Sequence, residues 1–455
     1  MKILPKILAL LVFMLPLGAE SLPVVTLDEA IASAEENNIG LKQAAITLNQ
    51  TIRNENNYVS TYLPTFGLSA TAGTGVSFPN QGTLTATDKT TFNGVDLDLG
   101  ASLNFSYALT GSKITDGESR RLSKESATID YQSNVSSLES NVIKAYWNLA
   151  ALDIAIKNAE LSVSDAQSSY DSVAEMYNSG MTDELSLTQA ELALNQAIYT
   201  LQTYKDQKAL ALASFRALTG IEGDFQTEML PETVMLQLPS PAELYDIYAE
   251  DTTNIRSARN ALATAKTAEK TATLSQYMPT VTANINYTYG GGLSSKASLT
   301  ASAGEYTTSA HNLSGTVAVN IPLSSYIPGS TADETRKNAS DTVSIAALSL
   351  SNTQNTLLQT IESNTMSISQ QQQLLSMAES SLILAENTYS LAEEAFEAGL
   401  MSAYDLSARR SDLLSAQMSE TSARLNHLLS SYDLAFTLGI ELQDLQEQYA
   451  IKETV

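Results

Sequence analysis

The side chains that could carry chemistry in this chain are few and widely spaced. The sequence contains two histidines, His311 and His427, and no cysteine. Without cysteine there is no disulfide, no thiolate metal site and no cysteine nucleophile, and two histidines so far apart form no metal-ligand motif. A P-loop and a Gly-x-Ser-x-Gly motif are also absent. The sequence therefore predicts no enzyme, no cofactor and no resident metal.

The charge of the chain is strongly acidic, with a formal net charge of −25. Such a charge makes nucleic acid an improbable partner, because the phosphate backbone would be repelled. Two interpretations stay open for the acidity: a solvated, mutually repelling surface, or a conduit that favours cations.

The first residues have the layout of a secretory signal peptide. Lys2 and Lys6 precede an apolar run that ends near Leu17, and cleavage is expected after Ala19. No later stretch contains 18 or more apolar residues, so no transmembrane helix is predicted. Only a closed barrel could then cross a bilayer.

The elements that must position any site are repeated at an interval of about 219 residues. Gly-Ile-Glu closes both copies, at Gly220 and at Gly439, and Tyr170 and Tyr389 fall in register. We predict a signal peptide at 1–19, a first repeat at 20–220, a linker at 221–239, a second repeat at 240–440 and a C-terminal tail at 441–455. A duplication of this length indicates one structural unit made of two half-units.

Each repeat is expected to contain a helix, a pair of strands, a very long helix and a further helix. In the first repeat, Thr26 with Glu29 forms a capping-box signature, and Pro64 ends the opening helix. The expected ranges are a helix over 26–58, strands over 65–77 and 95–109, and helices over 114–178 and 182–219. In the second repeat they are a helix over 241–275, strands over 280–290 and 311–323, and helices over 331–396 and 401–438. The segments 79–93 and 290–310 are predicted to be exposed loops.

The strands alternate apolar and polar residues, most clearly from Val95 to Leu109. This period of two fits a soluble sandwich as well as a barrel, although lengths near ten residues and tyrosine-rich ends are typical of outer-membrane strands. Helices of about 65 residues would be about 100 Å long, which is typical of a coiled coil. Four strands are too few to close a barrel, so a barrel requires an oligomer.

Several short words recur in order along the chain. They are Leu-Asp-Glu-Ala at Leu27, Asn-Asn at Asn37, Tyr-x-Pro-Thr at Tyr62 and Tyr277, Val-Asn-Ile-Pro-Leu at Val319, and long helices that turn at a glycine. With these words in this order, the chain resembles the TolC family of outer-membrane efflux proteins over essentially its whole mature length.

The resemblance implies a mixed α and β membrane protein that forms a homotrimer. Four strands per protomer would form one twelve-stranded β-barrel in outer-membrane lipid, continued by a long α-helical coiled-coil tunnel in the periplasm. The implied partners are a periplasmic adaptor (membrane fusion protein) and an inner-membrane pump. They would dock on the helix turns that contain Gly180 and Met181, and Gly399 and Leu400.

The resemblance also places a periplasmic gate after the second turn. Asp405 occupies the position of the first gate aspartate, whereas Ala408 occupies the second acidic position. Met401 stands where an arginine can tether the closed state, and Phe396 takes the place of a gate aromatic. Asp405 would form a carboxylate ring in the trimer, or would simply suit the dipole at a helix start.

The implied function is passive conduction of substrates to the exterior, as the outer-membrane channel of a tripartite efflux or type I secretion system. Two alternative functions stay open. One is a periplasmic or surface coiled-coil scaffold or adhesin whose strands form a small sandwich. The other is an open porin, against which the length of the helices argues. Dependence on detergent separates a lipid-facing barrel from a soluble scaffold. The sequence does not identify the transported substrate or the partner pump.

Overall fold

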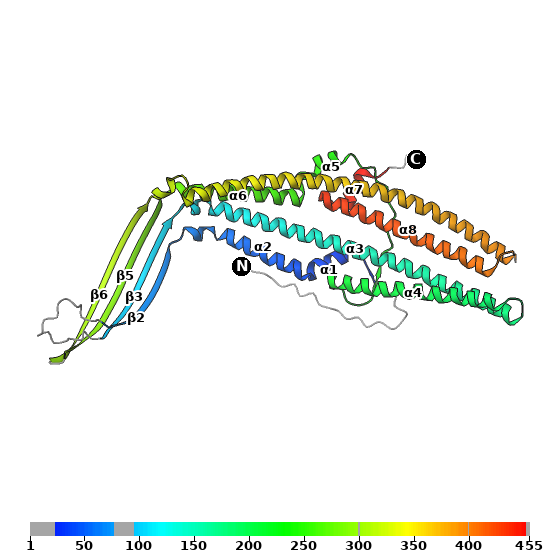
Figure 1. The fold of residues 1–455 in the computed structure, drawn as a ribbon, viewed down its shortest axis with the longest axis horizontal. Helices are drawn as coiled ribbons and strands as arrows, with labels where there is room; N and C mark the ends of the chain where they lie inside the picture. The colour runs from blue at the N-terminus through cyan, green and yellow to red at the C-terminus, as the bar shows by residue number, and fades with distance from the viewer. Residues whose placement is uncertain (1–22, 77–94, 299–300, 399, 452–455) are drawn as a thin grey trace. The chain divides into compact units, whose positions relative to one another are not determined.

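The computed structural model describes residues 23–76, 95–298, 301–398 and 400–451 (Figure 1). The predicted signal peptide at 1–19, the predicted loop at 79–93, Gly399 and residues 452–455 lie outside these residues. The elements of the first repeat are β1 (Val24–Val25), α1 (Leu27–Asn37), α2 (Ile39–Asn56), η1 (Tyr58–Tyr62), β2 (Thr65–Val76), β3 (Val95–Leu109), α3 (Gly111–Asn178) and α4 (Glu184–Thr219). Those that follow are β4 (Gln226–Thr227), α5 (Pro241–Tyr248), η2 (Ala249–Asp251), α6 (Thr253–Tyr277), β5 (Thr280–Ser298), β6 (Ala301–Asn320), η3 (Leu323–Tyr326), α7 (Thr331–Glu397), α8 (Ala403–Leu438) and α9 (Leu442–Tyr449).

The chain packs as two units that do not coincide with the two repeats. The helical unit comprises residues 1–43, 133–249 and 357–455, and the strand unit comprises 44–132 and 250–356. Each unit therefore takes part of both repeats. The duplication is visible instead in matched elements, because α4 and α8 are both 36 residues long and both end at a left-handed glycine, Gly220 and Gly439.

The strand unit contains one antiparallel sheet of four strands in the order β2-β3-β5-β6 (Figure 1). Its register aligns the alternating residues of all four strands, so that Leu68, Leu103, Tyr287 and Leu313 form one row across the sheet. The strands β2 and β6 lie at the edges. Because side chains alternate along a strand, the register gives this sheet one apolar and one polar face.

The apolar face is exposed to solvent in the single chain. It comprises Phe66, Leu68, Leu103, Phe105, Ile285, Tyr287, Leu313 and Val317, all exposed or partly exposed. On this face the rings of Phe66 and Phe105 meet edge to face at 5.1 Å. Within the described part of the chain no second sheet covers these residues, so the sandwich that a soluble scaffold would require is not formed.

The polar face is held by hydroxyl pairs between neighbouring strands. The Oγ atoms of Ser69 and Ser102 lie 2.6 Å apart, and Thr65 Oγ1 lies 2.6 Å from Ser106 Oγ. Cross-strand pairs of this kind stabilise a sheet and leave its polar side wettable.

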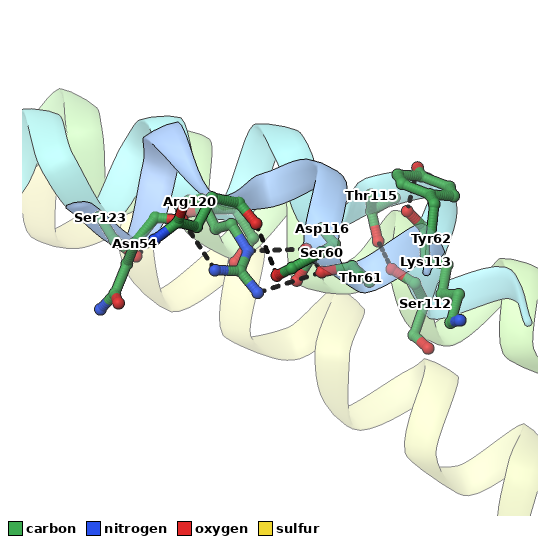
Figure 2. A network of polar contacts seen from close by, with 12 residues as sticks. Asn54, Ser60, Thr61, Tyr62, Ser112, Lys113, Thr115, Asp116, Arg120 and Ser123 are labelled. Carbon is green, nitrogen blue, oxygen red and sulfur yellow. Dashed lines mark hydrogen bonds and ion pairs between the residues drawn. The ribbon is translucent and has the colours of Figure 1, made fainter. Parts of the chain in front are cut away.

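A polar network joins η1 and α2 to the first turns of α3 (Figure 2). The guanidinium of Arg120 donates to Asp116 Oδ2 at 2.7 Å, to the Asn54 carbonyl at 2.8 Å and to Thr61 Oγ1 at 3.1 Å. Thr61 in turn donates to Asp116 at 2.7 Å. Burial is the largest single influence on the pKa of the Asp116 carboxyl and acts to raise it. The bonds from Thr61 and Arg120 together outweigh burial, so the pKa is lowered. Arg120 thus connects η1 and α2 to α3.

The start of α3 packs closely against α6. A Cβ atom on Gly111 would lie 2.7 Å from the backbone carbonyl carbon of Leu274 and 2.9 Å from its oxygen. Since backbone cannot move aside as a flexible side chain can, only glycine fits here. Deeper in the same pair of helices, Asn260 donates to the Leu122 carbonyl at 3.1 Å.

The second pair of strands differs from the prediction. We expected strands over 280–290 and 311–323 with a loop between them, whereas β5 extends to Ser298 and β6 begins at Ala301. The glycines at 290–292 and the serines and threonines beyond them hid the alternation, yet their backbones continue the ladder. At the other end β6 stops at Asn320, because Pro322 cannot donate to a sheet.

The opening helix is also interrupted where one continuous helix was expected. The capping box of Thr26 and Glu29 is present, but α1 ends at Asn37 and Asn38 adopts an extended conformation. The Asn38 side chain then accepts a hydrogen bond from the Leu41 backbone at 3.0 Å, which starts α2. The Asn-Asn word is therefore a joint between two helices. In the second repeat, α5 and α6 divide the expected helix in the same way.

The core of the helical unit is centred on Tyr146 of α3, which is fully buried. Its hydroxyl donates to the Val25 carbonyl at 2.8 Å and accepts from the Glu228 backbone at 2.8 Å. Its ring meets those of Trp147 at 5.0 Å and Phe215 at 6.2 Å. Burial raises the pKa of Tyr146 to about 12. Trp147 is buried in the same core.

The linker and the tail pack on each other rather than extending freely. The segment predicted as a C-terminal tail, 441–455, contains α9, in which Leu445 is fully buried. Beyond α9, Ile451 donates to the Met235 carbonyl at 2.9 Å, and Gln237 of the linker donates to the Tyr449 carbonyl at 2.8 Å. Buried Leu236 anchors the linker side of this contact.

Candidate functional site

The turn between α3 and α4 is built by Gly180. This residue has a φ of +72°, a conformation that favours glycine. The Met181 backbone donates to the Met176 carbonyl at 2.8 Å and closes the turn, after which Asp183 caps α4 by accepting from the Ser186 backbone at 2.9 Å. The Met181 side chain is 73% exposed at the tip.

The turn between α7 and α8 repeats this geometry. The Leu400 backbone donates to the Ala395 carbonyl at 2.8 Å, which matches the bond that closes the first turn. Ser402 then caps α8, and the Leu400 side chain is 84% exposed. Both turns thus present an exposed aliphatic side chain directly after the reversal.

Asp405 lies in the first turn of α8 and is bonded locally. Its backbone donates to Ser402 Oγ at 3.1 Å, and Ser402 Oγ donates to the Asp405 carboxylate at 2.7 Å. A carboxylate in the first turn also interacts favourably with the helix dipole. The Asp405 side chain is exposed, so its carboxylate can interact with groups outside this chain.

Behind the turns, the four long helices of the helical unit enclose a cleft of about 800 Å³. Serine and alanine are the commonest residues of its walls. Three larger side chains stand out: Arg410 of α8 forms an ion pair with Asp165 of α3 and lies 5.3 Å above the ring of Tyr389 of α7. Burial lowers the pKa of Arg410. One guanidinium thus joins three of the four helices.

None of the described helices has a stretch that is both apolar and long enough to pass through a membrane. Within the described residues, no group of three or more metal-binding side chains comes together. His311 accepts or donates a hydrogen bond with the Tyr287 hydroxyl at 2.8 Å in the strand unit, whereas His427 is buried in the helical unit.

Known proteins are similar to this chain both in sequence and in its fold of a four-stranded sheet and four long helices. The sequence profile of the family described as outer membrane efflux protein matches residues 30–221, which is nearly the whole first repeat. Over these residues the chain is similar to the outer membrane efflux protein family. None of the curated proteins matches the chain in sequence.

The fold of this chain is similar to several solved channels. The CmeC outer membrane channel of Campylobacter jejuni has 18% identity over 93% of this chain and 88% of that one, with a TM-score of 0.71. CusC has 14% identity over 91% and 92%, with a TM-score of 0.71. The open-state MtrE channel of Neisseria gonorrhoeae has 18% identity over 91% and 89%, with a TM-score of 0.66. These likenesses cover both repeats.

The matching family is described as outer membrane efflux protein, and the similar structures of CmeC and MtrE are outer membrane channels. Both findings agree with the location and the activity that the sequence predicts. The predicted fold class, long helices with four strands in each chain, is confirmed by the structure and by these similar channels.

The four predicted gate residues come from two helices and the turn between them. Phe396 of α7 lines the cleft. Asp405 is exposed at the start of α8, while Met401 and Ala408 are half-exposed and line no part of the cleft. Asp405 and Ala408 are three residues apart on α8 and so share one face of that helix.

The sequence analysis missed the group formed by Arg410, Asp165 and Tyr389. Asp165 and Arg410 are remote in sequence, so no spacing relates them. A weak signal did exist: Arg410 shares one helix face with Leu406, Leu414 and small residues, which is an unusual place for an unpaired charge. Such an arginine predicts an acidic partner from another helix.

Proposed function

We propose that this protein acts as a homotrimer that forms one passive exit duct of a tripartite system. The observation that carries the proposal is the sheet of four strands, with an exposed apolar face and two open edges, β2 and β6. Open edges invite pairing with other strands. Three copies would give twelve strands, enough to close a barrel with the apolar face in lipid and the polar face around a lumen.

The proposed partners are a periplasmic adaptor (membrane fusion protein) and an inner-membrane pump that supplies the energy. TolC-like channels are trimers in tripartite systems. In this chain the helix turns support docking there, because Met181 and Leu400 expose aliphatic side chains at the two tips. Gly180 sets the first turn, and Gly399 would hold the equivalent place in the second. An exposed apolar tip is a suitable anchor for a protein partner.

We also propose that Asp405 is the charged element of the periplasmic gate. In a trimer, three exposed carboxylates at the same height would form a ring that favours cations. The strongly acidic composition of the chain supports the same preference. Because Ala408 and Met401 carry no charge, this ring would have a single acidic layer and no arginine tether, while Phe396 would act from the cleft.

The proposal is tested by replacing Asp405 with Asn and recording single channels in a KCl gradient. Asparagine can still accept the hydrogen bond from Ser402 Oγ, so the start of α8 is preserved and only the charge is removed. We expect the ratio of K⁺ to Cl⁻ permeability to fall by a factor of about ten.

Asp412→Asn is the matched control, since Asp412 is also exposed on α8 but is paired with Arg409 at 2.9 Å. It is expected to leave the permeability ratio unchanged. An unaltered reversal potential in Asp405→Asn, with the closed-state conductance also unaltered, would exclude Asp405 from the gate.

A further inference from the structure

The junction between the strands and the helices carries exposed apolar and aromatic side chains that the channel function does not use. They belong to η1 and η3 and to the residues directly after each. They are Tyr58, Val59, Tyr62, Leu63, Leu323, Tyr326 and Ile327, all exposed, and are called here the junction belt. Both 3₁₀ helices lie where a strand of the sheet meets the helical part of the chain, so the belt lies at the periplasmic end of the sheet.

Two tyrosines of the junction belt are held in place by their hydroxyls. Tyr62 donates to the Lys113 carbonyl at 2.6 Å (Figure 2), and Tyr326 donates to the Tyr277 carbonyl at 3.0 Å. Their rings nevertheless remain exposed. A fixed ring with a satisfied polar end is what tyrosines present at the boundary between lipid and water.

Lys113 differs from most of the cations near this junction. Several neighbouring arginines and lysines are paired: Arg120 with Asp116, Arg121 with Glu118 and Glu125, Lys124 with Glu55, and Arg336 and Lys337 with Asp333. Lys113 has no carboxylate within ion-pair distance among the described residues. Its Nζ instead lies 5.0 Å from the centre of the Tyr107 ring.

The position of Tyr107 relates Lys113 to the membrane. Tyr107 alternates in phase with Phe105 and Leu103, so it continues the apolar face toward the periplasm. The strand β3 is hydrogen-bonded to β2 and β5 of its own chain, and only β2 and β6 are free to pair with other subunits. A neighbouring subunit therefore has no strand edge to lay over this part of β3.

From this arrangement we propose that Lys113, seated on Tyr107, binds the headgroup phosphate of an anionic phospholipid in the periplasmic leaflet of the outer membrane. The junction belt forms the interfacial surface around it. The inference rests on the barrel of the proposed function. Lysines at helix or strand ends place their stems on apolar surface and their amines among the headgroups, where anionic lipid attracts them.

The test uses the full-length trimer in detergent, titrated with phosphatidylglycerol and followed by native mass spectrometry. Lys113→Gln is expected to weaken phosphatidylglycerol binding about fivefold, the effect of one lysine at an anionic surface, while binding of phosphatidylcholine changes little. Lys113→Arg keeps the charge and is expected to retain the affinity. Lys337→Gln is the matched control, because that lysine is already paired with Asp333 at 2.8 Å.

Two results of the lipid titration would overturn the proposal. One is equal phosphatidylglycerol affinity in the native protein and in Lys113→Gln; the other is an equal loss in Lys113→Gln and Lys337→Gln, which would indicate general charge attraction. Protection of Lys113 from an amine reagent in lipid-free trimers would likewise contradict it, since a neighbouring subunit would then cover the site. Single-channel recordings of the same samples distinguish an error in the lipid site from an error in the proposed function. A trimer that conducts has formed its barrel, so a missing lipid effect in that trimer counts against the lipid site alone.

Discussion

Replacing Leu103 with Lys is expected to abolish insertion of the protein into the outer membrane. Leu103 lies near the middle of the apolar face, in one row with Leu68, Tyr287 and Leu313. A lysine at the middle of the lipid-facing side of a barrel costs about 2–4 kcal/mol in each subunit, and a trimer carries three. The measurement is the amount of protein that fractionates with the outer membrane as a heat-stable trimer.

The neighbouring residue provides the control for this experiment. Asn104 lies next to Leu103 on the same strand, and its side chain points to the polar face. Asn104→Lys should insert normally and change the conductance instead, because the new charge would line the lumen. If Leu103→Lys inserts as well as Asn104→Lys, the assignment of the two faces is wrong.

Tyr146→Ala is expected to destabilise the helical unit by about 3–5 kcal/mol. The side chain is 0% exposed, and its removal leaves a cavity beside Trp147 and Phe215. The substitution also takes away the hydroxyl that binds the Val25 carbonyl and the Glu228 backbone. Trp147 is the only tryptophan in the chain, so its fluorescence during denaturation reports directly on this core.

Tyr199→Ala on α4 serves as the matched control, since Tyr199 is 74% exposed. Substitutions at exposed positions change the free energy of unfolding by about 0.5 kcal/mol or less. Equal denaturation midpoints for the two variants would show that Tyr146 does not hold β1 and the linker against α3.

The regular parts of this fold were predictable from local patterns. Strict alternation located β3, with the bounds 95–109, and the helix predicted over 182–219 is α4 (Glu184–Thr219), which Asp183 caps. Both signals are local, because they depend on side-chain period and on one cap. The extended part of β5 was not predictable in this way, since its glycines have no side chain to alternate and its pairing partners in β6 determine its conformation.

The packing units were not predictable from the repeat. A duplicated sequence suggests two similar domains, but each unit draws helices or strands from both copies. The reason is that a long helix such as α3 passes through both units, so the boundary between units crosses elements rather than separating them.

The candidate site was predictable only in part. The glycine turns could be located because the two repeats carry Gly180 and Gly399 in the same register. Asp405, in contrast, was placed only by the resemblance to the TolC family, and its role at the gate stays a prediction. The ion pair of Arg410 with Asp165 could not, because it depends on which faces of α3 and α8 meet. Likewise, Lys113 becomes noticeable only when its neighbours are seen to be paired and Tyr107 is seen beneath it.

The central claim is that three copies of the sheet close into one conduit in lipid. Its most direct test is the mass of the purified native protein by analytical ultracentrifugation, with and without detergent. The claim predicts a trimer in detergent that precipitates once detergent is withdrawn, because the apolar face then meets water. A monodisperse monomer that stays dissolved without detergent would contradict it.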